Sequence, residues 1–139
     1  MLYSNAPNDF LEIDLNVDMV VRGRENGFNT CYGDSTNIDV LQEIGLSNKT
    51  TKAVIIALDN VWVSKSTIRA VKSIAKRVKI FARAKNIEES KVFIAEGVKD
   101  IYPETVESSF LLASGLLESI GIRSNKIEDL ISELRKNNY

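Results

Sequence analysis

Apolar residues along this chain form short runs separated by stretches in which they recur at helical spacing. The runs predict five strands, at residues 10–15, 28–32, 53–58, 78–84 and 98–102. The run at 53–58 is apolar at successive positions, which is typical of a strand buried on both faces of a parallel sheet. We therefore expect this strand to be central in its sheet.

Glycines mark the ends of three predicted helices. Gly27, Gly45 and Gly97 each follow a helical-looking stretch and precede an apolar run. Glycine adopts the left-handed conformation just past a helix without a Cβ clash, so these positions predict exits from helix to strand.

Polar residues with capping potential predict where the helices begin. The signals are Asn16, Thr36 with Asp39, Asn86 with Glu89, and Pro103 with Thr105. Strands that alternate with helices of about ten residues imply right-handed crossovers. The predicted fold class is α/β, a Rossmann-like doubly wound sheet that is mostly parallel.

The C-terminal part of the chain carries more apolar helix surface than one sheet face needs. We predict a dimer interface at Phe110, Leu111, Leu112, Gly115 and Leu116. An amphipathic helix follows at about residues 127–135, after a capping signal at Asn125 and Glu128. The expected organisation is one domain over residues 1–122 and a helix within 123–139 that packs on this domain or on its partner.

Composition narrows the classes of function. The 139 residues carry 18 basic and 19 acidic side chains, a net charge of −1, so nucleic acid is not an expected partner. The sequence contains no histidine, which excludes a Ser-His-Asp triad and any metal site with histidine ligands. We therefore expect neither catalysis nor a metal site. The lone Cys31, with neither a signal peptide nor a membrane span in the sequence, favours a cytoplasmic location.

Candidate ligand-binding residues follow the predicted strands, because ligands of doubly wound sheets lie beyond the carboxyl ends of the strands. Asp14 ends the first predicted strand, where an acid that binds a ribose hydroxyl would lie. The alternative is that Asp14 and Asn16 cap the next helix.

Two further polar groups follow the next strands. Asp34, Ser35 and Thr36 come after the second strand and could hold a nucleobase, and Asp59 follows the run at 53–58. For each of these residues the alternative role is a helix cap.

Basic residues end the fourth predicted strand. Arg83 and Lys85 alternate with alanines, so both point to one face. An arginine beside the ligand crevice suits a phosphate or carboxylate. The alternative is that Arg83 lies over a helix or pairs with a nearby acid such as Glu104.

One expected element of a dinucleotide site is missing. The glycine-rich turn should lie about 20 residues before the ribose acid, and residues 1–13 contain no glycine. The chain is therefore expected to lack the first strand, the glycine loop and the first helix of the fold. Binding of NAD(H) or AMP is expected to be weak.

Several motifs together resemble a known family. They are Ile13-Asp14-Leu15-Asn16, Gly27 to Thr36 with Tyr32-Gly33-Asp34-Ser35-Thr36, Ala53 to Asp59, Ile80-Phe81-Ala82-Arg83-Ala84, and Ile101 to Thr105 with Glu107-Ser108-Ser109. In this order they resemble the RCK domain, the TrkA N-terminal type of NAD-binding domain. They are most similar to the C-terminal domains of Kef-type potassium efflux antiporters, and the resemblance covers about residues 10–122.

The resemblance implies a cytoplasmic regulatory domain at the inner membrane. Such a domain forms homodimers, is attached to a membrane-embedded potassium or cation antiporter or channel, and gates ion flux through bound nucleotide. Glutathione is a further ligand in the Kef branch, although Lys85 stands where Kef-like sequences often have a second arginine.

The resemblance also implies roles for particular residues. Asp14 matches the ribose-binding acid, Asp59 matches the crevice residue after the central strand, and Arg83 matches the basic strand end that holds anions. The turn from Asp34 through Ser35 to Thr36 matches the one beside the adenine.

Two other interpretations remain open. The chain could be a dimerisation scaffold without a ligand, since the glycine loop is missing. It could also be a fragment of an NAD-dependent oxidoreductase, but 139 residues leave no room for a substrate domain.

Overall fold

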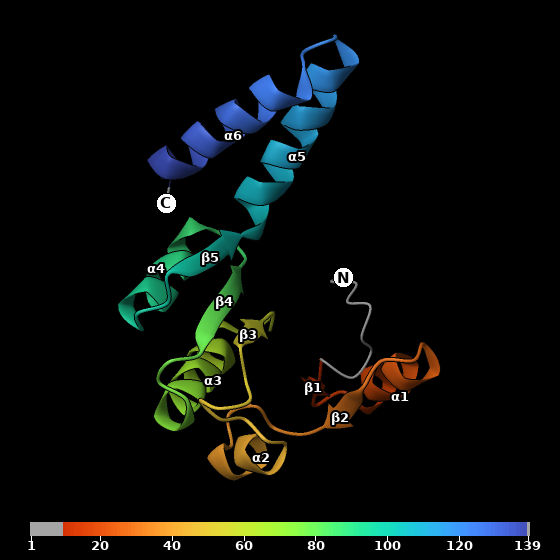
Figure 1. Ribbon diagram of the computed structural model, residues 1–139, viewed down its shortest axis with the longest axis vertical. Coiled ribbons are helices and arrows are strands. Elements are labelled where there is room, and N and C mark those ends of the chain that lie inside the picture. Colours follow the sequence, from red (N-terminus) through yellow and green to blue (C-terminus); the bar gives the residue numbers. More distant parts are fainter. Residues whose placement is uncertain (1–9, 139) are drawn as a thin grey trace. The chain divides into compact units, whose positions relative to one another are not determined.

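The computed structural model describes residues 10–138 and shows alternating strands and helices, as the apolar pattern predicts (Figure 1). These residues form two compact units. The first contains residues 10–52 and Ser66–Val78, and the second contains Ala53–Lys65 together with residues 79–138.

The first unit contains a parallel pair of strands. β1 (Glu12–Asp14) pairs with β2 (Thr30–Tyr32), and α1 (Val17–Glu25) connects them. The Thr30 hydroxyl donates a 2.9 Å hydrogen bond to the Val20 carbonyl of α1. A Cβ added to Gly23 would lie 2.5 Å from the Thr30 methyl, so this close approach of α1 to β2 requires glycine.

Helix α2 (Ile38–Glu43) follows β2 and corrects one predicted helix start. Asn37 is its N-cap, and the Asn37 side chain accepts a hydrogen bond from the amide of Asp39. The prediction that Thr36 starts this helix was wrong, because the Thr36 hydroxyl donates to the Asp34 carboxylate instead.

The second unit contains a three-stranded parallel sheet in the order β3-β4-β5. Its strands are β3 (Ala53–Ile56), β4 (Lys79–Ala84) and β5 (Asp100–Pro103). Helix α4 (Ile87–Ala95) joins β4 to β5, contacts both strands and buries Phe93. Helix α3 (Val61–Ile74) follows β3, and its residues are divided between the two units.

One face of this sheet is buried and the other is open. Ile56 and Ala82 are register partners and are almost fully buried. On the opposite face, Ile55 is 56% exposed and Tyr102 is 45% exposed. The prediction that the run at 53–58 is central and buried on both faces was therefore wrong for residues 10–138, where β3 is an edge strand with one face uncovered.

The C-terminal helices form an antiparallel pair within the second unit (Figure 1). Helix α5 (Glu104–Ser119) leads away from β5, and α6 (Ser124–Asn138) returns beside it after a turn at Gly121, whose φ is 87°. Ile127 and Ile131 of α6 are buried. Helix α6 begins earlier than the predicted residue 127.

Local signals for the ends of helices were confirmed. Gly27, Gly45 and Gly97 all have positive φ, as expected for residues just past a helix. Asn16 and Asn86 cap α1 and α4 through their side-chain oxygens. Within residues 10–138, no helix is both long and apolar enough to cross a bilayer.

Candidate functional site

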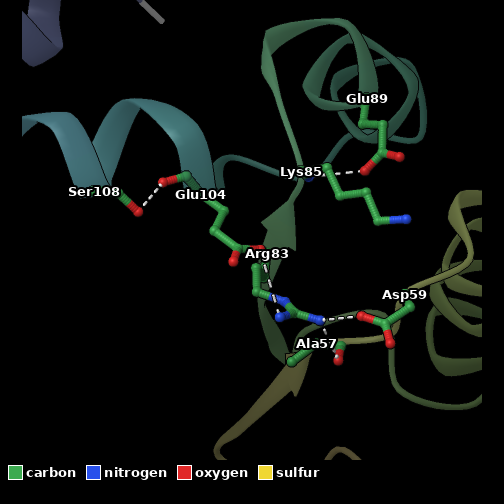
Figure 2. Close-up of polar contacts among 7 residues, drawn as sticks. All are labelled: Ala57, Asp59, Arg83, Lys85, Glu89, Glu104 and Ser108. Carbon is green, nitrogen blue, oxygen red and sulfur yellow. Dashed lines mark hydrogen bonds and ion pairs between the residues drawn. The ribbon is translucent and has the colours of Figure 1, made fainter.

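The strands of the second unit end at a cluster of charged side chains centred on Arg83 (Figure 2). Arg83 lies at the carboxyl end of β4, and Asp59 follows β3. The Arg83 Nη2 atom donates to Asp59 Oδ1 at 2.8 Å and to the Ala57 carbonyl at 3.1 Å. The structure thus brings together two residues that the sequence predicts to be ligand-binding.

A second carboxylate reaches the same guanidinium from α5. Glu104 Oε2 lies 3.5 Å from Arg83 Nη1. Glu104 opens α5 immediately after β5, so the ends of all three strands contribute to the cluster. This is the pairing named as the alternative role of Arg83. An anionic ligand would have to displace one of these carboxylates or bind a donor that they leave unused.

The arginine remains accessible to solvent despite these contacts. The side chain of Arg83 is 39% exposed and that of Asp59 is 88% exposed. Exposed ion pairs contribute little to stability, typically between zero and about 1 kcal/mol. The cluster can therefore exchange partners at a small energetic cost.

Two side-chain hydrogen bonds link the end of β4 to the first turn of α4. The Asn86 side chain accepts from the Glu89 amide at 3.0 Å, and the Glu89 carboxylate accepts from the Lys85 amide at 2.8 Å. In Figure 2 the contact drawn for Lys85 is that of its backbone amide with Glu89, whereas the ion pairs drawn for Arg83 are with Asp59 and Glu104.

An open groove of about 490 Å³ lies beside this cluster, within the second unit. Its wall includes both charged and apolar side chains: Arg83, Tyr102, Glu104, Glu107, Ser108, Phe110, Leu111, Ser114, Ile131 and Arg135. The groove could hold a small polar molecule with an apolar part.

Arg135 closes one side of the groove from α6. Its Nε donates to Glu107 Oε1 at 3.0 Å, and a second bond joins Nη2 to the other carboxylate oxygen. The guanidinium also lies 5.8 Å from the centre of the Phe110 ring. Tyr102 and Arg135 were not predicted from the sequence as lining residues, because residues 28 positions apart, such as Glu107 and Arg135, leave no local signal of contact.

The first unit contains the other predicted site residues, and Asp14 and its neighbours are bonded close by. Asp14 Oδ1 accepts from the Asn16 amide at 2.8 Å, and the Asp14 carbonyl accepts from the Gly33 amide at 3.1 Å. The alternative, that Asp14 and Asn16 cap the next helix, holds for Asn16, whose side chain accepts from amides of α1, whereas the Asp14 carboxylate accepts from the Asn16 amide just before the helix.

The turn after β2 is also organised by its own side chains. Asp34 Oδ1 accepts from both the amide and the hydroxyl of Thr36, and these two bonds lower the pKa of Asp34. The Ser35 hydroxyl lies 2.9 Å from the Thr67 hydroxyl of the same unit. Burial raises the pKa of the nearby Cys31 thiol, and Arg24 opposes this effect.

The predicted interface residues on α5 differ in exposure. Leu111, Leu112 and Leu116 are 76%, 78% and 63% exposed. Phe110 is half-buried on the side of α5 that contacts Arg135. A Cβ added to Gly115 would meet open space, since nothing lies within 4 Å of that position. Among residues 10–138, no group of three or more Cys, Asp and Glu side chains could hold a metal ion.

Curated relatives of this chain are potassium transport proteins. It is 29% identical over 126 residues to K(+) efflux antiporter 2, chloroplastic, of Arabidopsis thaliana, covering 91% of this chain and 11% of the relative. It is 26% identical over 123 residues to a glutathione-regulated potassium-efflux system protein of Haemophilus influenzae, covering 88% of this chain and 20% of the relative. The chain thus spans about a tenth to a fifth of the length of these relatives.

Solved structures share the fold. The AMP-bound C-terminal domain of Kef from Shewanella denitrificans superposes with a TM-score of 0.66 at 20% identity, covering 91% of each chain. The GsuK channel bound to NAD gives a TM-score of 0.66 at 21% identity over 74% of this chain and 18% of the channel chain. These likenesses confirm the Rossmann-like α/β fold.

The family model of the TrkA-N domain matches residues 2–103, which include all five strands of the structure. Together with the potassium efflux antiporters among the relatives, this match confirms the predicted resemblance. The chain belongs to the TrkA-N domain family.

Proposed function

We propose that this chain is a ligand-sensing regulatory domain of a potassium or cation transport protein. The observation that carries the proposal is the TrkA-N match over residues 2–103, combined with relatives that are potassium efflux antiporters. By this proposal the domain lies at the cytoplasmic face of the inner membrane and carries out no catalysis of its own. Its partner is a membrane-embedded antiporter or channel.

The proposed ligand is a nucleotide, NAD(H) or AMP. Two solved neighbours are described as bound to AMP and to NAD, which supports this class of ligand. In this chain the proposed contacts are Asp14, Asp34, Ser35, Thr36, Asp59 and Arg83. Arg83 is the group among them that can attract an anion, and its exposure of 39% leaves it accessible.

The proposed homodimer forms through α5. Leu111, Leu112 and Leu116 are all more than 60% exposed. Burial of apolar surface is favourable by about 25 cal/mol for each Å², so covering these side chains would stabilise a dimer. Contact between the same leucines of two copies would bury this surface in an isologous interface.

A chimera tests the regulatory role. The segment of the Haemophilus influenzae relative that aligns with this chain is replaced by this chain, and potassium efflux from cells is compared with that of the relative lacking the segment. We expect the chimera to hold efflux below that of the deletion. Efflux equal to that of the deletion would contradict the proposal.

A ligand-free dimerisation scaffold is the second candidate. The observation in its favour is that Arg83 already forms ion pairs with Asp59 and Glu104. The cationic side chain best suited to bind an anion at this site therefore has partners within the chain. In that case the chimera would still assemble and lower efflux, but added nucleotide would not change it.

A further inference from the structure

Two segments of the first unit carry positive charge and no acid. Residues 44–52 and 66–78 contain six basic residues and neither aspartate nor glutamate, although the whole chain has a net charge of −1. Two of the six, Arg69 and Lys72 of α3, interact with other groups. The other four have exposed side chains and are called the basic patch: Lys49, Lys52, Lys76 and Arg77.

A hydrogen bond joins the two segments that carry the basic patch. The Asn48 side chain accepts from the backbone amide of Arg77 at 3.0 Å. Lys49 follows Asn48 and Lys76 precedes Arg77 in the sequence, so this bond brings the backbones of the two lysines close together. Both partners of the bond belong to the first unit. The patch is therefore one surface and not two separate groups of charges.

The loop that carries Lys49 is ordered by its own hydrogen bonds. The Thr51 amide donates to the Ser47 carbonyl at 3.1 Å, and the Ser47 amide donates to the Thr51 hydroxyl at 3.2 Å. The Thr50 hydroxyl donates to the Gly45 carbonyl at 3.0 Å. Lys49 lies inside this turn with its side chain exposed. The backbone therefore holds this cation in a fixed place at the surface.

Contacts within the chain do not account for the four charges of the patch. Among residues 10–138, no acidic side chain forms an ion pair with any of them. A basic residue in the last turn of a helix interacts favourably with the helix dipole, which explains Lys72 of α3. This effect does not reach Lys49 and Lys52, which lie well past the last turn of α2. The patch therefore suits a negatively charged partner.

We propose that the basic patch docks on the anionic lipid headgroups of the membrane that contains the transport protein. This inference rests on the proposed function, which places the domain beside that membrane. Clusters of about four to eight Lys and Arg residues bind anionic membrane surfaces, and each cation strengthens binding about fivefold.

The number of cations indicates what this docking achieves. Four charges bind a free domain weakly, but a covalent link to a membrane protein raises the effective concentration of the domain at the surface. Under that condition the patch orients the domain, because the side that carries it is attracted to the headgroups.

A nucleic acid fits the patch less well than a membrane does. Residues 44–52 and 66–78 contain no Phe, Tyr or Trp on which a base could stack. Acids elsewhere in the chain bring the net charge to −1, which opposes binding along a polyanion. A planar layer of headgroups requires positive charge on only one side of the protein.

Vesicle co-sedimentation tests the docking surface with neither nucleotide nor transporter present. The chain is mixed at about 50 mM KCl with vesicles of phosphatidylcholine, or with vesicles that also contain about one third phosphatidylglycerol. A patch variant combines Lys49→Gln, Lys52→Gln, Lys76→Gln and Arg77→Gln. A control variant removes as many charges from exposed positions of the second unit, by Lys91→Gln, Lys99→Gln, Lys126→Gln and Lys136→Gln. Circular dichroism checks that all three proteins are folded.

We expect the unmutated chain to bind the anionic vesicles and not the neutral ones. The partition coefficient of the patch variant should be lower by at least about tenfold, because four contributions of about fivefold are lost. The control variant should bind nearly as well as the unmutated chain. Raising KCl to about 0.5 M should release the chain, since salt screens exposed charges.

Two results in the vesicle assay would overturn the proposal. They are equal sedimentation of the unmutated chain with neutral and anionic vesicles, and an equal loss of binding in the control variant. Stronger binding to double-stranded DNA or to polyglutamate than to anionic vesicles, abolished in the patch variant, would assign the patch to a nucleic acid or an acidic protein and would also overturn it. Because the chimera measures efflux and this assay measures lipid binding, the regulatory function and the docking surface can fail separately.

Discussion

Asp59 and Arg83 lie 24 positions apart in the sequence, and their side chains are joined by a 2.8 Å hydrogen bond at the ends of β3 and β4. Glu104 contacts the same guanidinium at 3.5 Å. One cation therefore lies between two carboxylates at the position where the fold binds its ligands. This arrangement determines how the site should respond to mutation.

Replacing Asp59 with Asn should strengthen anion binding, because it removes one competing carboxylate while keeping the shape of the side chain. The expected gain in affinity for AMP is about fivefold, equivalent to about 1 kcal/mol. Isothermal titration calorimetry measures it, with Asp39→Asn in the first turn of α2 as a matched control that removes a carboxylate of the first unit. Unchanged affinity in Asp59→Asn would assign AMP to donors other than Arg83.

Replacing Arg83 with Ala should lower anion affinity and leave the fold nearly intact. The ion pairs of Arg83 are exposed, so the free energy of unfolding should fall by no more than about 1 kcal/mol. Chemical denaturation measures this change. If Arg83→Ala unfolds the domain, the residue is a structural ion-pair partner and its ligand-binding role fails.

The chain alone should bind nucleotide weakly. Backbone amides of a glycine-rich turn at a helix N-terminus normally hold the pyrophosphate, and residues 1–13 contain no glycine. Titrations with NADH, NAD and AMP should show little heat at sub-millimolar ligand. A micromolar Kd for any of the three nucleotides would refute this expectation.

Leu112→Glu or Leu116→Glu should convert a dimer into a monomer with unchanged helix content. A carboxylate placed in an isologous contact would be buried without a partner in each subunit, at a cost of several kcal/mol. Light scattering measures the mass. Val17→Glu, at an exposed apolar position of α1, is the control that should remain dimeric. An unmutated chain that is monomeric at tens of micromolar would exclude the interface.

Helix α6 should be held to α5 mainly by its buried isoleucines. Ile131 is 7% exposed, so Ile131→Ala should lower the free energy of unfolding by about 2 kcal/mol. Leu130, on the same helix but 44% exposed, provides the control, and Leu130→Ala should cost less than about 1 kcal/mol. Equal losses in urea denaturation would show that α6 does not pack as described.

Features of the fold and the site could be predicted where the interacting residues are close together in the sequence. Caps at Asn16 and Asn86 and the glycine exits act over three or four residues, so they were readable from the sequence. The start of α2 was misplaced by one residue, because Asp34 competes for the Thr36 hydroxyl.

By itself, the sequence determined the alternation of strands and helices, the parallel α/β class and the absence of a glycine turn before Asp14, because apolar periodicity and turn chemistry are local properties. Only the tertiary structure decided that Arg83 lies between Asp59 and Glu104, and that Arg135 closes the groove beside Glu107. Each of these features depends on strand pairing or helix packing between distant segments, and such contacts form only when the burial of apolar surface offsets the entropy of ordering the chain.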